Sequence, residues 1–261
     1  MNDSIEMLIS TMNTDSQSLV KKMNIQTDAI VINQTNQVKY NMFHLDKNTI
    51  QEYQFNERGI GLSRNNALLR ATADICMMAD DDMVYVDNYP DLVKSEYEKY
   101  PDADMILFNV RIHDEKGTQE KVDQNGKVHY FNSLRYGTVT FSFRRDSVLR
   151  HNIFFSQLFG GAKYGNGEDS IFLWDCLKAN MNIRKSTKII ADVYNEESTW
   201  FKGFDEKFFL DRGALYRALS KRFYKLLIWQ YAIRKRHTFP ENMSVFESIQ
   251  LMLRGAKTFS Q

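Results

Sequence analysis

A short apolar segment that ends in a run of acids constrains the fold of this chain more than any other feature. Residues 75–79 (ICMMA) carry no charge, and Asp80, Asp81 and Asp82 follow at once. Such an uncharged run is typical of a central parallel strand that is buried on both faces. Because open α/β sheets bind their ligands at the carboxyl ends of the strands, these carboxylates are expected at the functional edge of the sheet.

Three adjacent carboxylates repel one another, so a cation beside them would stabilise their ionised forms. Hard oxygen ligands favour Mg²⁺ or Mn²⁺, which commonly bridge one or two carboxylates to the phosphates of a nucleotide. The acidic run therefore predicts a divalent cation. A solvated acidic turn is the alternative interpretation, because short acidic motifs are frequent by chance.

The segment before this strand predicts a helix with a glycine-rich start. Gly59 and Gly61 permit a tight backbone, and Ser63 can cap a helix whose apolar residues then recur near helical spacing. Arg64 would lie in the first turn, where the helix dipole disfavours a cation. An anionic partner such as a phosphate explains Arg64 better than helix stability does, and an ordinary exposed arginine is the alternative.

A second acidic pair, Glu168 and Asp169, follows a glycine-rich approach. Residues 159–167 contain four glycines, and the pair begins a predicted helix 86 residues after Asp82. Acids at a helix start also interact favourably with the helix dipole, so this pair alone does not identify a site.

Taken together, these motifs resemble the family 2 inverting glycosyltransferases of the GT-A fold, including bacterial capsular and exopolysaccharide enzymes. The resemblance rests on Gly-x-Gly-x-Ser-Arg-Asn at residues 59–65, on the apolar strand with Asp-x-Asp and on Gly-Glu-Asp at residues 167–169. It covers roughly residues 3–200. Met83 stands where the family usually has a last Asp. The family's segment over the diphosphate matches residues 194–200 (YNEESTW), in which no third metal ligand is assigned.

The resemblance implies a role for each candidate residue. Asp80 and Asp82 would hold Mg²⁺ or Mn²⁺ against the diphosphate, and Arg64 would assist at the phosphates. Asp169 would be the general base, and Glu168 would orient the acceptor. The residues expected to bind the nucleotide sugar are Thr11, Asn13, Asn33, Gln34, Arg64, Asp80 and Asp81. Thr11 and Asn13 match the family's first loop, and Asn33 and Gln34 stand in the second loop, where amides replace the family's usual Asp.

Hydrophobic patterning divides the chain into alternating strands and helices, which favours an α/β fold with a mostly parallel sheet. Further strands are predicted at residues 5–10, 29–32, 38–45, 105–112, 139–143 and 183–193. Helices are predicted at residues 15–23, 87–100 and 245–253, and residues 113–131 predict a polar excursion or hairpin. We expect a catalytic domain at residues 1–203, with a nucleotide-sugar half at 1–110 and an acceptor half at 111–203, and a helical extension at 204–261.

The carboxyl end is basic although the whole chain has a net charge of only +1. Residues 211–261 contain ten Lys or Arg and three Asp or Glu, whereas the first 210 residues contain 24 and 30. Leu215, Leu219, Phe223 and Leu227 recur every fourth residue, which predicts one amphipathic helix. Such a helix would lie on an anionic membrane or pack on the domain with its basic side in water.

Cysteine usage and hydropathy favour a cytosolic protein. The two cysteines, Cys76 and Cys176, have no metal-ligating neighbours and are expected to be reduced. No signal peptide is recognised, and no run reaches the ~18 apolar residues needed to cross a bilayer. Any membrane contact at the inner face is therefore expected to be peripheral.

The predicted function is transfer of a sugar, from a UDP-sugar in particular, to a hydroxyl of a glycan acceptor that could be lipid-linked, in cell-surface polysaccharide synthesis. A sugar nucleotidyltransferase is one alternative, although residues 9–16 (ISTMNTDS) lack its glycine-rich phosphate loop. A dehalogenase-like phosphatase would place Asp-x-Asp after the first strand, and this chain does not have it there. A non-catalytic sugar-nucleotide-binding subunit of the same fold is the remaining alternative.

Overall fold

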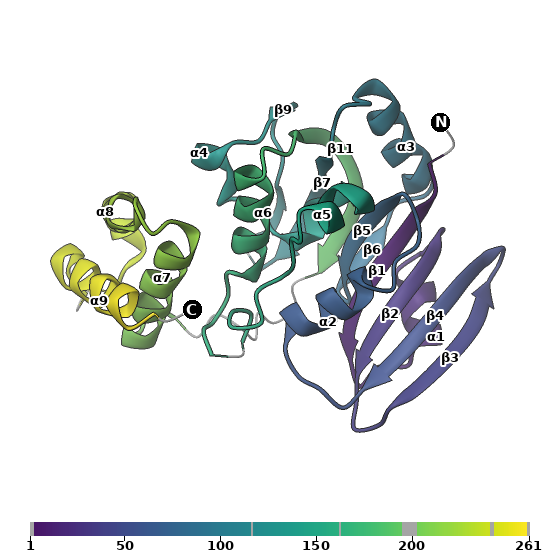
Figure 1. Ribbon diagram of the computed structural model, residues 1–261, viewed down its shortest axis with the longest axis horizontal. Coiled ribbons are helices and arrows are strands. Elements are labelled where there is room, and N and C mark those ends of the chain that lie inside the picture. The colour runs from purple at the N-terminus through teal and green to yellow at the C-terminus, as the bar shows by residue number, and fades with distance from the viewer. Residues whose placement is uncertain (1–2, 116, 162, 195–202, 241–242, 260–261) are drawn as a thin grey trace.

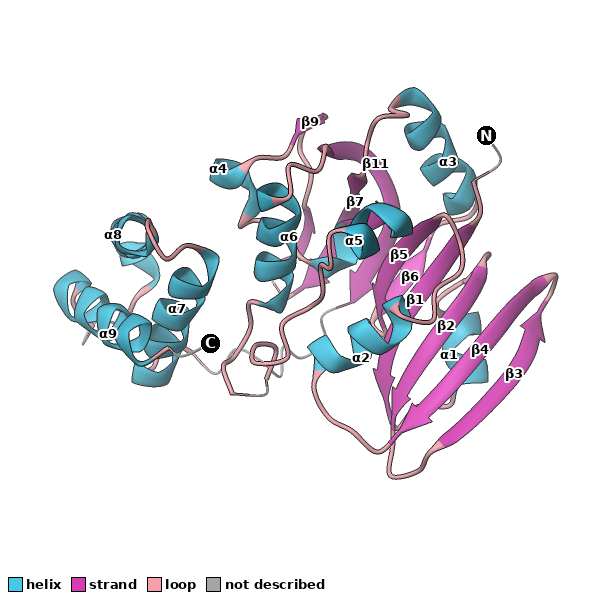
Figure 2. Cartoon of the chain, viewed as in Figure 1, coloured by secondary structure: helices cyan, strands magenta, loops and turns pink. Residues whose placement is uncertain are grey.

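The computed structural model describes residues 3–115, 117–161, 163–194, 203–240 and 243–259. Within these ranges, one mixed β-sheet carries helices on both faces, and a group of helices packs together at the carboxyl end (Figures 1 and 2). The bundle of α7, α8 and α9 lies at the end of the molecule opposite β3 and β4 (Figure 1).

The strands and helices have the following bounds. The strands are β1 (Ile5–Met12), β2 (Asp28–Gln34), β3 (Lys39–Leu45), β4 (Asn48–Phe55), β5 (Ile75–Asp80), β6 (Met83–Tyr85), β7 (Met105–Asp114), β8 (Gly117–Glu120), β9 (Gly126–Lys127), β10 (Phe141–Arg144) and β11 (Ile183–Tyr194). The α-helices are α1 (Ser16–Lys22), α2 (Ile60–Leu68), α3 (Tyr89–Lys99), α4 (Tyr130–Ser133), α5 (Arg145–Arg150), α6 (Glu168–Lys178), α7 (Glu206–Leu219), α8 (Tyr224–Lys235) and α9 (Val245–Thr258). Thr138–Thr140 and Arg236–Thr238 form short 3-10 helices.

The sheet has the strand order β3-β4-β2-β1-β5-β10-β7-β11-β6, with β8 paired to β7 and β9 to β11. Its centre is parallel, because β1 pairs in parallel with both β2 and β5, and β2 pairs in parallel with β4. The carboxyl ends of these strands therefore meet at one edge, where Ser10 of β1 is paired with Asp80 of β5. That edge is where ligands of open α/β sheets bind.

Each face of the sheet buries its own hydrophobic core. Alternate residues of β1 illustrate the division, because Met7 packs with α1 and α3 whereas Leu8 packs with α2 and α6. A third core lies within the α7–α9 bundle and also includes Phe159 and Trp174 from the preceding segment. The bundle is therefore packed on the region around the start of α6.

The predicted fold class, a helix-flanked α/β sheet followed by a helical extension, is confirmed. The local structure differs from the predictions at several points. Asn33 and Gln34 belong to strand β2 and not to the loop after it, since they continue its parallel pairing with β4. Strand β4 was not predicted at all. The expected single helix through residues 215–227 is interrupted, because α7 ends at Leu219 and α8 begins at Tyr224.

The two cysteines are free thiols and fully buried, and burial raises the pKa of each well above its ordinary value. They are hydrophobic core residues in the structure. None of the helices in the described ranges has the length and apolar character that crossing a membrane requires.

Candidate active site

The two acidic motifs of the sequence meet at the carboxyl edge of the sheet. Asp80 is the last residue of β5, and Asp81 and Asp82 form the turn before β6. Glu168 and Asp169 are the first two residues of α6. The fold thus brings together carboxylates that are far apart in the sequence, and one arginine connects them.

Arg64 lies between the two motifs. Its side chain is only 4% exposed, and Nη2 donates to Asp80 Oδ1 at 2.8 Å while Nη1 donates to Glu168 Oε1 at 2.7 Å. Although burial alone would lower the pKa of Arg64, the charges of Asp80 and Glu168 raise it above its ordinary value. The guanidinium group also lies 5.5 Å from the centroid of the Phe155 ring. Arg64 is therefore a permanently charged connection between the strand and the helix.

The sequence-based placement of Arg64 in the first helical turn was wrong. Helix α2 begins at Ile60 after Gly59, whose φ of +121° is accessible to glycine, so Arg64 lies in the second turn. Ser63 does not cap the helix, and its hydroxyl donates to Ser10 Oγ at 2.9 Å. The anionic partners of Arg64 in the structure are Asp80 and Glu168. A contact with phosphate stays a prediction.

The three aspartates of the turn have different surroundings. Asp80 accepts from Arg64, and Asp81 Oδ2 accepts from the hydroxyl of Thr11 at 2.6 Å. Asp82 Oδ1 is buried and has no hydrogen-bond partner among the described residues. Burial, together with the charges of Asp80 and Asp81, raises the pKa of Asp82 to about 6. Asp82 is therefore the carboxylate whose ionised form most needs a further positive partner.

The surroundings of Asp82 fit a hard divalent cation. An unpartnered carboxylate oxygen beside two further acids is a suitable oxygen ligand set for Mg²⁺ or Mn²⁺. Among the described residues, however, no three His, Cys, Asp or Glu side chains converge on one metal position. The arrangement therefore suits an ion that takes only one or two carboxylates and completes its shell with water or phosphate oxygens.

Asp169 is the partly exposed member of the second motif. Its Oδ1 accepts from the amide of Ser170 at 2.6 Å. Burial and the charge of Glu168 raise the pKa of Asp169 to about 6, and Arg64 opposes that rise. A methyl group added at Gly137 would lie 3.1 Å from Asp169 Oδ2, so glycine leaves room beside this carboxylate. Asp169 is thus a carboxylate with a pKa suited to accepting a proton near neutral pH.

Glu168 faces the interior. Its Oε1 accepts from Arg64, and its Oε2 accepts from the amide of Gly167 at 3.1 Å. Both carboxylate oxygens therefore have partners within the protein. The predicted contact of Glu168 with an acceptor stays a prediction, and the observed contacts favour a role in holding Arg64.

The predicted nucleotide-binding residues lie around the ends of β1 and β2. Asn33 Nδ2 donates to the carbonyl of Thr14 at 2.6 Å, which fixes the loop after β1. Gln34 Nε2 donates to the carbonyl of Gly59 at 2.9 Å, immediately before α2. Asn13 has a left-handed backbone with φ of 51° and an exposed side chain. Thr11 contacts the acidic turn directly, whereas Asn33 and Gln34 organise the backbone near it.

Sequence reasoning missed Glu52, which lies on the unpredicted strand β4. Its carboxylate accepts hydrogen bonds from Ser16 Oγ at 2.7 Å, Asn41 Nδ2 at 2.7 Å and Asn33 Nδ2 at 3.1 Å. Although burial would raise the pKa of Glu52, these hydrogen bonds bring it below its ordinary value. Glu52 thus fixes the amide of Asn33. The signal in the sequence was a single Glu within the alternating segment Asn48–Phe55.

Sequence reasoning also missed Asp211 of α7. Its Oδ2 accepts from the amide of Gly165 at 2.9 Å, in the glycine-rich loop before Glu168. A methyl group added at Gly167 would lie 2.7 Å from Leu215 Cδ1, so α7 packs closely on the same loop. The bundle therefore supports the segment that carries Asp169.

Most of the segment predicted to lie over the diphosphate, residues 195–200, lies outside the described residues. Its first residue, Tyr194, ends β11, and its amide donates to the carbonyl of Asp82 at 3.0 Å.

Solved structures of S. aureus TarS share this fold. The structure of TarS 1-349 in complex with UDP-GlcNAc aligns with a TM-score of 0.64 at 13% identity, covering 92% of this chain and 74% of that chain. The complex of TarS 1-349 with UDP gives 0.59 at 14% identity, covering 95% and 69%. TarS 1-349 without a named ligand gives 0.65 at 13% identity, covering 97% and 81%.

TarS is a GT-A-type glycosyltransferase, so these structures confirm the predicted GT-A fold. At such low sequence identity, the similarity concerns the fold alone. No protein-family model matches the chain, and no curated protein matches it.

Proposed function

We propose that this protein is a metal-dependent inverting glycosyltransferase that uses a nucleotide-sugar donor, a UDP-sugar in particular. The observation that carries the proposal is the connection of the two acidic motifs through Arg64, at the ligand-binding edge of a GT-A fold. The choice of donor is supported by the TarS structures with UDP-GlcNAc and UDP. Both motifs together support the proposal, because each motif alone also has a plain structural explanation.

On the donor side, Asp82 and Asp80 would hold Mg²⁺ or Mn²⁺. When bound, such an ion offsets the negative charge that develops on the departing diphosphate. Thr11 fixes Asp81 next to this position, and Asn33 holds the loop after β1 against β2. Thr11, Asn13, Asn33 and Gln34 would then surround the nucleoside, either by direct contact or by shaping the backbone.

On the acceptor side, Asp169 would act as the general base. It would take the proton from the acceptor hydroxyl while that oxygen forms a bond to the anomeric carbon and the bond from that carbon to the diphosphate breaks. Attack from the face opposite the leaving group inverts the anomeric centre and needs no covalent sugar-enzyme intermediate. Asp169 has the appropriate pKa of about 6, because it is then largely ionised at neutral pH.

Arg64 and Glu168 would position the two sides relative to each other. The guanidinium group holds Asp80 at 2.8 Å and Glu168 at 2.7 Å, so it fixes the start of α6 relative to the acidic turn. Its positive charge also favours a diphosphate nearby. The acceptor would be a glycan of a cell-surface polysaccharide, and a lipid-linked glycan is consistent with the basic carboxyl end.

Calorimetric titration of UDP into the full chain, with and without Mn²⁺, tests the donor site. We expect binding that requires Mn²⁺ and that Asp82→Asn weakens at least about tenfold, since it removes a metal-ligating carboxylate. Asp91→Asn is the matched control, because Asp91 is an exposed acid on α3. Absence of UDP binding with and without Mn²⁺ would contradict the proposal.

A further inference from the structure

The outer face of α8 carries apolar side chains that the fold does not bury. Leu226 is 66% exposed, Trp229 is 49% exposed and Ile233 is 50% exposed. The helix is held on the bundle by its opposite face, where Ile228 and Ala232 are fully buried. The exposed apolar side chains therefore contribute little to folding, and a contiguous exposed apolar group on a helix indicates a binding surface.

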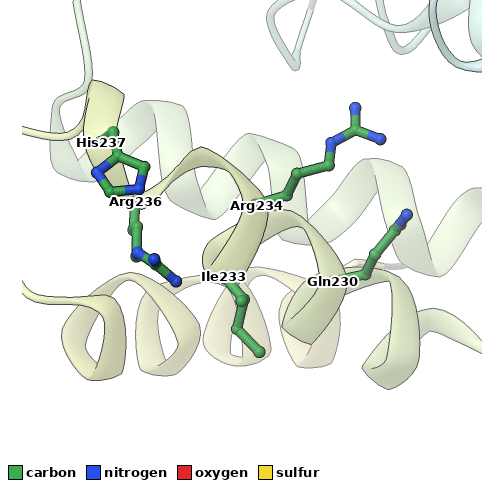
Figure 3. A pocket seen from close by; sticks show the side chains of 5 residues that line it. All are labelled: Gln230, Ile233, Arg234, Arg236 and His237. Atoms are coloured by element: carbon green, nitrogen blue, oxygen red, sulfur yellow. The ribbon is translucent and has the colours of Figure 1, made fainter.

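Cations flank these apolar side chains at both ends of α8. Leu226, Trp229 and Ile233 lie three and four residues apart within α8, which places them on one face, and Arg222 and Arg236 flank the helix in the turn before it and at its C-cap. This set of five residues is called the α8 stripe below. Figure 3 shows Ile233 and Arg236 projecting from the same side of the helix, whereas Arg234 projects from the other. The stripe thus has an apolar centre with a cation at each end.

The chain segment that carries the α8 stripe has only positive charges. Residues 212–240 contain eight Lys or Arg and no Asp or Glu. Arg222, Lys225 and Arg236 are exposed, and none of them forms an ion pair with another described residue. Because this segment contains no acids and these cations form no ion pair with another described residue, their positive charges are available to an anionic partner outside the protein.

We propose that the α8 stripe docks on an anionic phospholipid surface. An amphipathic helix with Trp and Leu on its contact face and Lys or Arg beside them is the arrangement that lies in the interface of such membranes. A dissolved polyanion would bind the cations, but its binding would not require Leu226 and Ile233. A membrane uses both, because the apolar side chains enter the acyl boundary while the cations meet the phosphate groups.

Docking through α8 would orient the candidate active site. Helix α7 of the same bundle binds the amide of Gly165 through Asp211, and Leu215 packs on Gly167 next to Glu168. The bundle and the loop before Asp169 are therefore packed as one unit. A membrane-bound α8 would hold the proposed base at a fixed height above the lipid surface, which suits an acceptor hydroxyl on a lipid-linked glycan.

Vesicle flotation of the full chain tests the proposal. We expect the wild type to float with vesicles of phosphatidylcholine and phosphatidylglycerol in low salt, and not with phosphatidylcholine alone. Because each cation near an anionic membrane contributes about 1 kcal/mol, Arg222→Gln, Lys225→Gln and Arg236→Gln together should weaken binding about 100-fold. Leu226→Ser with Ile233→Ser should weaken it at least about tenfold.

Two variants are matched controls for composition. Val38→Ser with Met42→Ser removes exposed apolar side chains from the edge strand region, and Lys21→Gln, Lys22→Gln and Lys39→Gln together remove exposed cations elsewhere. Both controls should float as the wild type does. Thermal unfolding should be unchanged in every variant, since all substituted side chains are exposed.

Any of three flotation results would overturn the proposal: no flotation of the wild type, equal loss in the controls, or binding that depends on the cations and not on Leu226 and Ile233. The last outcome would indicate a dissolved polyanion. A wild type that is dimeric by light scattering and becomes monomeric when Leu226 and Ile233 are replaced would indicate a second copy of the chain instead. No nucleotide is present in these experiments, so their failure is distinguishable from failure of the proposed glycosyl transfer.

Discussion

Replacement of Arg64 by methionine should destabilise the whole domain, because Arg64 is the buried connection between Asp80 and Glu168. Removing one partner of a buried ion pair costs about 3–5 kcal/mol, since a charge is left uncompensated. The Glu168 side chain is 10% exposed, whereas Asp80 is 31% exposed and partly screened by solvent. We therefore expect the lower end of that range, about 3 kcal/mol.

The assay is thermal and urea unfolding of the purified full chain. A loss of about 3 kcal/mol corresponds to a decrease in Tm of about 6–12 °C for a domain of this size. Arg111→Met is the matched control, because Arg111 pairs with Asp192 through two hydrogen bonds but is 40% exposed. An exposed pair contributes about 1 kcal/mol or less.

A double variant separates the ion pair from the loss of packing. Arg64→Met with Glu168→Gln removes both the cation and its most buried partner, so it should recover part of the stability lost in Arg64→Met. An Arg64→Met variant that unfolds within about 1 kcal/mol of the wild type would refute the assignment of Arg64 as a buried electrostatic connection.

Three further predictions concern turnover, measured as UDP release from a UDP-sugar. The value of kcat should fall as the pH decreases through about 6, because protonated Asp169 cannot accept a proton. Glu168→Gln should move this fall to lower pH, since the charge of Glu168 raises the pKa of Asp169. Gly137→Ala should lower kcat about tenfold with little change in stability, because the added methyl group would lie 3.1 Å from Asp169 Oδ2. Asp211→Asn should lower kcat by loosening the loop at Gly165, whereas Lys207→Gln, a change to the exposed partner of Asp211, should not.

Each of these predictions has a clear negative result. An unchanged pH profile in Glu168→Gln would show that the acid limb does not belong to Asp169. A Gly137→Ala enzyme with wild-type kcat would show that turnover does not depend on the exact position of the Asp169 carboxylate. Equal decreases of kcat in Asp211→Asn and Lys207→Gln would indicate general destabilisation of the bundle.

The acidic turn and the sheet around it were predictable because the residues involved follow short-range rules. Residues 75–79 of β5 carry no charge, and the acids that begin at Asp80 lie at the carboxyl end of this strand, as predicted. Glu168 and Asp169 begin α6 as predicted. The pairing of Arg64 with both motifs was not predictable, because a sequence does not reveal which distant carboxylates lie beside the second turn of α2.

The failure to predict β4 has a physical cause, which is the long-range burial of a polar group. The alternation of polar and apolar residues in β4 is weak, because the polar residue Glu52 is one of its buried residues. Glu52 is held there by hydrogen bonds from α1, β2 and β3. The break between α7 and α8 was hidden by apolar residues that keep a four-residue spacing through it, namely Leu215, Leu219, Phe223 and Leu227. Ser220 was a usable signal, since its hydroxyl accepts from the amide of Phe223 in the turn before α8.

Turnover of a UDP-sugar by Asp169→Asn tests the central claim most directly. UDP-GlcNAc is the first donor to test, and UDP release is measured beside calorimetric titration of UDP in the presence of Mn²⁺. The account predicts that the variant binds UDP as the wild type does and loses at least about 100-fold in kcat, the least expected of a general base. Wild-type kcat in Asp169→Asn would contradict the account.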